Sequence, residues 1–180
     1  MNDNRSEHVE EQSAGEETGF NIYVEALNDD RPRRDLLIVK CGHRTFGIFA
    51  DETDGIFDWK SPTPLPDAPK SILGVINARG RILTVLDPVE LFGESEDEPL
   101  KAKFVVSLHG DEQLGVAVDR VLQITEIVFE EVARPLPGKE QPPFIGTIQI
   151  DDLLVRIVEL TELFKLATHG ADRRRDRTQL

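Results

Sequence analysis

The side chains with the most reactive chemistry in this sequence are few and scattered. No two of the four histidines (His8, His43, His109 and His169) have the spacing of zinc ligands. His43 and His109 fall in corresponding predicted hairpin turns, where we expect solvated side chains. The single cysteine, Cys41, ends an apolar run and has no histidine motif beside it, so we expect a core-facing residue rather than a nucleophile. No metal site is predicted.

Two aspartates, Asp51 and Asp119, occupy equivalent places in an internal repeat and could in principle form a catalytic carboxylate pair. The Asp-Thr-Gly order of aspartic proteases is absent, and residues 53–55 read Thr-Asp-Gly. A turn or capping role is favoured for both aspartates. The glycine-containing stretch 74–80 lacks the Lys-Ser/Thr of a phosphate-binding loop. We therefore expect no catalytic residues and no cofactor, with a hydrolase using the aspartate pair as the alternative.

Composition narrows the class of partner. The 180 residues carry a formal net charge of −13, which disfavours binding to phosphate backbones, so no nucleic-acid partner is expected. One cysteine allows no internal disulfide, as is typical of a reducing compartment. The first residues contain no signal peptide, and no apolar run approaches the roughly 20 residues of a membrane span. These features predict a soluble, cytoplasmic protein without direct membrane insertion.

The chain divides into a body and two tails. Residues 1–34 hold nine acidic and four basic residues and are predicted to be a disordered acidic tail. From residue 36 short apolar runs alternate with Gly, Asp and Pro, which is typical of strands and tight turns. A basic tail is expected at residues 166–180. The predicted elements of the first half are strands at 36–40, 45–50, 55–59, 72–77 and 81–86, a proline-rich loop at 62–69, and a helical turn at 88–92.

The pattern of this first half then occurs a second time. Shifted by 68 residues, Leu36–Ile56 aligns with Phe104–Ile124 without a gap, and shifted by 72, Ile72–Phe92 aligns with Phe144–Phe164. The difference of four residues falls at the proline loops, where insertions are tolerated. Repeats at about 36–92 and 104–164, each near the lower size limit for independent stability, predict two small β-barrels that share a core within residues 35–165.

The segment Ile72–Asp87, which contains Leu-Gly-Val-Ile-Asn-Ala-Arg-Gly, resembles the signature of the CheW family, and Gly115–Asp119 and Phe144–Gly146 extend the resemblance. It implies an all-β fold of two intertwined SH3-like five-stranded barrels with short terminal helical turns, and no catalysis. It also implies an adaptor between the cytoplasmic coiled-coil tip of a chemoreceptor and the regulatory domain of a CheA-type histidine kinase. Such an adaptor would be recruited to membrane-associated receptor arrays and monomeric when alone.

The same resemblance places partner-binding positions at Thr53, Gly55, Gly74 and Arg79. Asn77 and Gly80 would anchor the loop that carries this arginine. Its guanidinium could form forked hydrogen bonds to a partner carboxylate, or it could only fix the loop to the other barrel.

The chain departs from the family where Thr53 and Gly55 replace a usual valine and glutamate, and where Pro88 follows Asp87. An alternative function follows, in which a CheW-like paralogue competes for or localises kinase and receptor partners in a non-chemotaxis chemosensory pathway.

Overall fold

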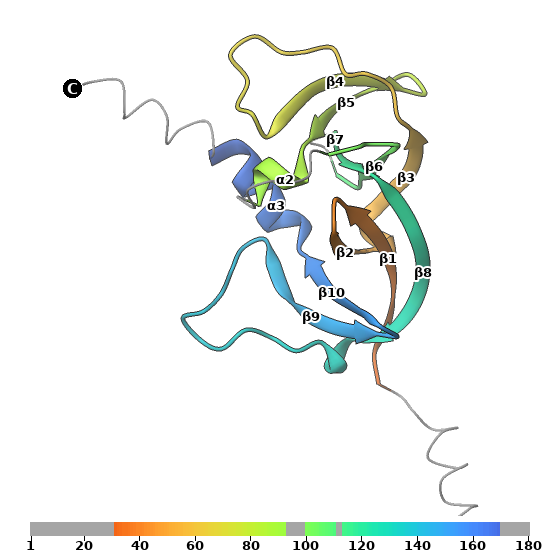
Figure 1. Ribbon diagram of the computed structural model, residues 1–180, viewed down its shortest axis with the longest axis vertical. Coiled ribbons are helices and arrows are strands. Elements are labelled where there is room, and N and C mark those ends of the chain that lie inside the picture. The colour runs from red at the N-terminus through yellow and green to blue at the C-terminus, as the bar shows by residue number, and fades with distance from the viewer. Residues whose placement is uncertain (1–30, 93–99, 111–112, 170–180) are drawn as a thin grey trace, which may run out of the picture. The chain divides into compact units, whose positions relative to one another are not determined.

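The computed structural model describes residues 31–92, 100–110 and 113–169, and in this part of the chain ten strands form two five-stranded sheets (Figure 1). Both sheets curl into SH3-like barrels, as the family resemblance implied. The first sheet has the order β8-β1-β2-β10-β9 and the second β3-β6-β7-β5-β4. The first contains β1 (Arg33–Cys41), β2 (Arg44–Phe49), β8 (Arg120–Val128), β9 (Phe144–Ile150) and β10 (Leu153–Val158). The second contains β3 (Thr53–Asp58), β4 (Ile72–Ala78), β5 (Arg81–Leu86), β6 (Phe104–Leu108) and β7 (Leu114–Val118).

Each barrel is built from both repeats. Strands β1 and β2 of the first repeat complete the sheet formed by β8, β9 and β10 of the second, and β6 and β7 complete the sheet of β3, β4 and β5. The chain leaves the first sheet through the 3-10 turn η1 (Ala50–Glu52) and returns to it at Asp119. Parallel pairings of β2 with β10 and of β5 with β7 join the repeats within each sheet. The predicted intertwined arrangement is therefore confirmed.

Three apolar clusters follow from this exchange. The first barrel encloses a cluster that includes Phe49 and Ile157, and the second encloses one that includes Leu83 and Val105. The third and largest cluster takes residues from both sheets, and its members include Phe46, Cys41, Leu86, Val106, Val116 and Leu163. Because small barrels bury little apolar surface alone, this shared cluster makes the two barrels one folding unit.

Two helices close the shared cluster. Helix α2 (Pro88–Leu91) begins with proline, and the Asp87 carboxylate accepts a hydrogen bond from the Val89 amide at 2.9 Å. Helix α3 (Leu160–His169) places apolar side chains at i, i+3, i+4 and i+7, and buries Leu163 and Ala167. Burial of Leu163 alone contributes about 2 kcal/mol.

The ordered body extends beyond the expected limits of residues 35 and 165. Strand β1 begins at Arg33, inside the expected acidic tail, and α3 continues to His169, inside the expected basic tail at 166–180. The buried Ala167 explains the extension of the helix, because its apolar face ends one turn later than the repeat does. The remainder of both expected tails, residues 1–30 and 170–180, lies outside the described residues.

Each proline-rich loop crosses back over a strand at a glycine. Thr63 forms two backbone hydrogen bonds with Val75, at 2.8 and 2.9 Å, and Ala133 forms the equivalent pair with Thr147. A Cβ atom at Gly74 would overlap the Thr63 carbonyl oxygen, and one at Gly146 would lie 2.6 Å from the carbonyl oxygen of Ala133. Both glycines are therefore required by the close approach of two backbones.

We predict that Gly74→Ala lowers the free energy of unfolding by about 2–5 kcal/mol, because it adds both left-handed strain and an overlap with backbone. Gly146→Ala is expected to be destabilising through the overlap alone. Gly138→Ala is the matched control, since Gly138 has a φ of +78° but open space around it, and should cost about 1–2 kcal/mol. Urea unfolding of the three variants measures these differences. Equal costs at Gly74 and Gly138 would show that the loop can move away.

Candidate partner-binding surface

The Asn-x-Arg-Gly motif forms the turn between β4 and β5. Ala78 pairs with Arg81, so Arg79 and Gly80 form a two-residue connection, with φ values of 53° and 86°. Positive φ at both residues is the geometry of a type I′ hairpin turn. The Asn77 side-chain oxygen accepts a hydrogen bond from the Gly80 amide at 2.8 Å, which fixes the turn. Arg79 is held in a left-handed conformation that costs a non-glycine residue about 1–2 kcal/mol, and its side chain is exposed.

The turn lies against β3 of the same barrel. The guanidinium of Arg79 is 5.5 Å from the centroid of the Phe57 ring, and Arg81 forms an ion pair with Asp54 at 2.7 Å. These contacts join the hairpin of β4 and β5 to β3, at the opposite side of the sheet order, and so help to close the barrel. The contact that the structure describes for Arg79 is with its own barrel.

A β-bulge on β3 explains how Asp54 reaches its partners. Thr53 pairs with Leu108 and Gly55 with Ser107, so Asp54 has no partner residue in β6. Bulges of this kind redirect a side chain. The Asp54 carboxylate accepts a hydrogen bond from Arg81 and lies 2.8 Å from Nδ1 of His109. It therefore joins β3 to β5 and to the β6–β7 turn of the second barrel. Thr53 closes η1 by donating from its hydroxyl to the Ala50 carbonyl at 2.9 Å.

Five of the six expected site residues lie on these two neighbouring elements. Thr53 and Gly55 flank Asp54 on β3, and Asn77, Arg79 and Gly80 form the turn that contacts this strand. Gly74 lies further back on β4, roughly 13 Å from Ala78 by the rise of a strand. The backbone of Thr63, in the proline-rich loop, lies against Gly74, and this close approach explains why a glycine is needed there.

Sequence reasoning did not identify Asp54, Phe57 and Arg81 as parts of this surface, nor two exposed isoleucines, Ile56 and Ile82, at 40% and 52% exposure. The apolar character of 56 and 82 within alternating strands was the available signal. The ion pairs of Asp54 left no signal, because they join residues distant in sequence. His109 is exposed, as expected of a turn residue, but it also contacts the Asp54 carboxylate.

The two aspartates considered for catalysis have separate structural roles. Asp51 forms an ion pair with Arg34 at 2.6 Å. Asp119 accepts hydrogen bonds from the amides of Gly42, at 2.6 Å, and Lys101, at 2.9 Å, which secures the crossing between the sheets. No interaction joins the two carboxylates within the described part of the chain. The turn and capping roles that the sequence favoured agree with these contacts.

Cys41 faces the core, as predicted. Its residue is 3% exposed and its Sγ lies 3.7 Å from the Ala117 carbonyl oxygen. Burial, and then the nearby Asp119 carboxylate, raise the pKa of the thiol far above its usual range, so the reactive thiolate is suppressed. The described residues include no group of three or more potential metal-ligating side chains, and none of their helices is long and apolar enough to cross a membrane.

Two SH3-like barrels that exchange strands, with an exposed turn and strand on one of them, define a double-barrel protein suited to binding other proteins. The family description CheW-like domain matches residues 35–168, and the chain belongs to this family. It is 27% identical over 146 residues to a probable chemotaxis protein CheW of Rhizobium etli, covering 78% of this chain and 92% of that protein.

Two further relatives and one solved structure extend the comparison. Chemotaxis protein CheW of Thermotoga maritima is 28% identical, covering 81% of this chain and 97% of its own length. Protein FrzA of Myxococcus xanthus is 25% identical, covering 78% and 91%. The crystal structure of the scaffolding protein TtCheW from Thermoanaerobacter tengcongensis shares the fold, with a TM-score of 0.66 at 23% identity over 76% of this chain and 91% of that one.

We predict that Cys41 reacts with a thiol reagent such as DTNB at least about 100-fold more slowly in the native protein than in urea, because reaction requires unfolding of the core. Cys41→Ser serves as the blank in both conditions. Rapid labelling of the native protein at neutral pH would show that β1 opens locally.

We predict that Arg81→Ala raises the pKa of Asp54, because the hydrogen bonds from Arg81 and His109 hold this pKa below its usual range. A lowered folded-state pKa stabilises the fold above the unfolded-state pKa, and this contribution is lost as the pH falls through the folded value. Titration of the Asp54 carboxyl carbon by NMR measures the change. Arg120→Ala on β8 is the control and should leave the titration unchanged; an unchanged pKa in Arg81→Ala would contradict the ion pair.

Proposed function

We propose that this chain is a non-enzymatic adaptor that couples the cytoplasmic tips of chemoreceptors to a CheA-type histidine kinase. Membership in the CheW-like domain family supports this function, as do relatives named chemotaxis protein CheW and a fold shared with a scaffolding protein. The adaptor acts in the cytoplasm at receptor arrays and binds the regulatory domain of the kinase. It is a monomer when alone.

The exposed position of the Arg79 side chain, on the turn between β4 and β5, is the observation that best supports the proposed binding surface. A strained turn fixed by Asn77 holds this guanidinium at the surface, where its described contact is the Phe57 ring and not a carboxylate. The neighbouring Arg81 already has its carboxylate in Asp54. A guanidinium kept without an internal acid is suited to a charge-assisted, forked hydrogen bond with a partner carboxylate.

The surroundings of Arg79 fit a protein partner better than a small anion. Ile56 and Ile82 add exposed apolar area on β3 and β5, and a protein interface combines such area with a few fixed polar contacts. The turn is joined to a closed barrel, so binding would order few additional groups. Signal transfer then follows from the geometry in which a rigid adaptor holds receptor and kinase.

A second candidate function is a paralogue that competes for or localises the same partners. The observation that favours it is the altered sequence of β3, where threonine and glycine occupy positions 53 and 55. Asp54 between them lies in the β-bulge and forms an ion pair with Arg81. This stretch moves negative charge from the usual family position to the adjacent one, which changes the charge pattern that a partner meets.

We predict that Arg79→Glu weakens binding to a receptor cytoplasmic fragment or to the kinase regulatory domain by about tenfold or more, because a repulsive charge replaces an interfacial cation. Binding is measured by isothermal titration calorimetry with partners from the same organism. Arg120→Glu carries the same charge change on β8 and should bind within about twofold of wild type. Unchanged affinity of a folded Arg79→Glu would exclude this turn from the interface.

Kinase reconstitution separates the two functions. An adaptor increases receptor-dependent autophosphorylation of the kinase when it is added, whereas a competitor decreases the activity supported by a second coupling protein. Loss of both effects together with loss of binding to both partners would show that the double barrel serves another pathway.

A further inference from the structure

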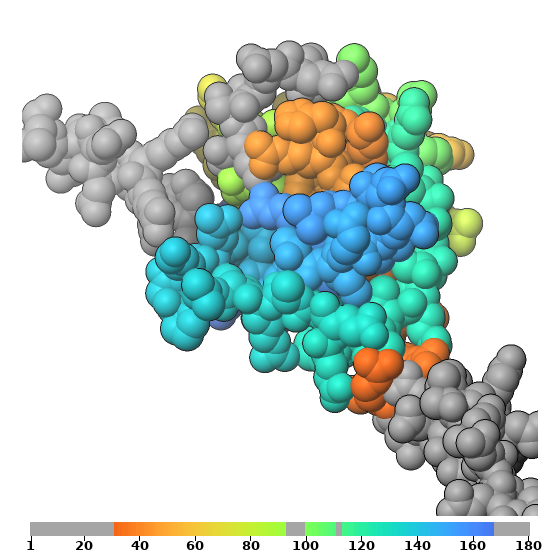
Figure 2. Space-filling model, turned by 60° about the horizontal axis from the view of Figure 1, so that its bottom comes forward, coloured from red at the N-terminus to blue at the C-terminus, as the bar shows by residue number. Residues whose placement is uncertain are grey.

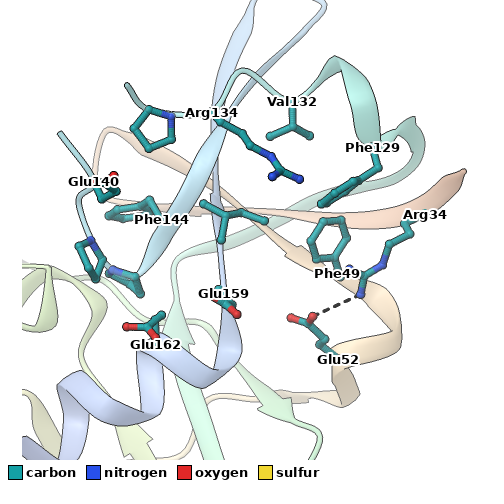
Figure 3. A pocket seen from close by; sticks show the side chains of 14 residues that line it. Arg34, Phe49, Glu52, Phe129, Val132, Arg134, Glu140, Phe144, Glu159 and Glu162 are labelled. Atoms are coloured by element: carbon teal, nitrogen blue, oxygen red, sulfur yellow. Dashed lines mark hydrogen bonds and ion pairs between the residues drawn. The ribbon is translucent and has the colours of Figure 1, made fainter. Parts of the chain in front are cut away.

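A pocket of about 530 Å³ lies on the first barrel. It is enclosed by the loop that begins with η2 (Phe129–Glu131), by the start of α3, and by the end of β2 with η1 (Figure 3). Figure 2 shows the chain leading into β9, in teal to cyan, at the surface of the molecule. Its volume is typical of pockets that bind small ligands or single side chains.

Most of the pocket wall is apolar. Phe49, Phe129, Val132, Phe144 and Ile145 line it, together with prolines of the loop. The pocket already accommodates two guanidinium groups of the chain itself, of which that of Arg134 lies 5.4 Å from the centroid of the Phe129 ring. Arg34 stacks 3.5 Å from the centroid of Phe49 and donates to Glu52 at 3.2 Å. An aromatic face beside a carboxylate is a favourable environment for an organic cation.

Carboxylates outnumber cations in the lining. Four glutamates (Glu52, Glu140, Glu159 and Glu162) face two arginines (Arg34 and Arg134). In Figure 3 Glu52, Glu159 and Glu162 follow one side of the pocket, and Arg134 projects from the opposite side. The pocket therefore carries an excess of negative charge beside an apolar wall, which disfavours an anionic ligand.

Two of these carboxylates have unused hydrogen-bonding capacity. Glu162 pairs with Lys165 at 2.6 Å, and Glu140 accepts from the Gly138 amide at 3.0 Å. The Oε2 atom of Glu52 is buried without a hydrogen-bond partner, and within the described residues the Glu159 carboxylate has neither a hydrogen bond nor an ion pair. The partly exposed Glu159 carboxylate can therefore accept a hydrogen bond from a ligand in the pocket.

The electrostatics of Glu52 support the same conclusion. Burial raises the pKa of Glu52, Arg34 opposes this rise, and the like charges of Asp51 and Glu159 add to it. Arg34 thus pairs with Asp51 and Glu52, and Glu159 adds a further like charge beside Glu52. A second cation between Glu52 and Glu159 would remove the remaining repulsion.

We propose that this pocket binds an elongated organic cation, with an ammonium or guanidinium head between Glu52 and Glu159 and an apolar stem against the loop prolines and Ile145. The head lies against the excess of negative charge at Glu52 and Glu159, and the stem covers the apolar wall. The same chemistry is offered by a free amine and by a lysine or arginine side chain of another protein. None of the six expected partner-binding residues lines the pocket, so this proposal does not depend on the proposed adaptor function.

The test is a titration of the full chain, followed by ¹H–¹⁵N NMR, with three probes. N-acetyl-L-arginine methylamide represents a protein side chain, cadaverine a free amine, and N-acetyl-L-citrulline methylamide is the neutral isostere of the first. We expect saturable shifts at the amides of Glu52, Ile145 and Glu159 with at least one cation and none with citrulline. Glu159→Gln and Glu52→Gln should each weaken binding at least about threefold, and Glu90→Gln on α2 should not.

The pattern of shifts decides each point. A response to the arginine probe alone identifies a protein side chain as the source, and a response to cadaverine alone identifies a free amine. Equal responses to arginine and citrulline, absence of saturation at the pocket, or equal weakening by Glu90→Gln would overturn the proposal. Because Glu159 is partly exposed at the start of α3, Glu159→Gln keeps the test valid if Glu52→Gln fails to fold.

Discussion

The exchange of strands between the repeats is the constraint on which the rest of this structure depends. Neither repeat has five neighbouring strands of its own, so each barrel forms only when the hairpin of the other repeat joins it. The largest apolar cluster then takes residues from both sheets, and α3 covers it with Leu163 and Ala167. The Asp119 carboxylate fixes the crossing between the sheets by accepting hydrogen bonds from two backbone amides. One of these amides belongs to the β1–β2 turn.

This constraint divides the surface into two regions with different chemistry. In the second barrel, closure brings the β4–β5 turn against β3, where Arg81 pairs with Asp54 and the guanidinium of Arg79 lies over the Phe57 ring. In the first barrel, the longer loop of the second repeat borders a pocket in which Arg34 pairs with Glu52, and one oxygen of Glu52 has no hydrogen-bond partner in the described part of the chain. Among the described residues, the second barrel thus has a guanidinium without a carboxylate partner, and the first has carboxylates that outnumber the cations beside them.

Much of the fold could be predicted from the sequence because its signals are local or repeated. The gapless alignment of Leu36–Ile56 with Phe104–Ile124 gave the duplication. The short apolar runs gave strands of five or six residues, whereas the observed strands have five to nine. The limits of the body were less accurate. Strand β1 and helix α3 extend into polar flanks because pairing with β8 and burial of Ala167 stabilise them, and both contacts are between residues far apart in the sequence.

The candidate sites were less predictable for the same physical reason. Asn77 and Gly80 could be assigned to a turn because one accepts a hydrogen bond from the other across three residues. Asp54, Phe57 and Arg81 meet only after the barrel closes. The pocket combines Arg34 and Glu52 with Glu159, more than 100 residues later in the chain. The excess of carboxylates over cations in this pocket cannot be predicted from composition. A chain with net charge −13 has many acidic residues, and only the fold determines which of them lack a hydrogen-bond donor.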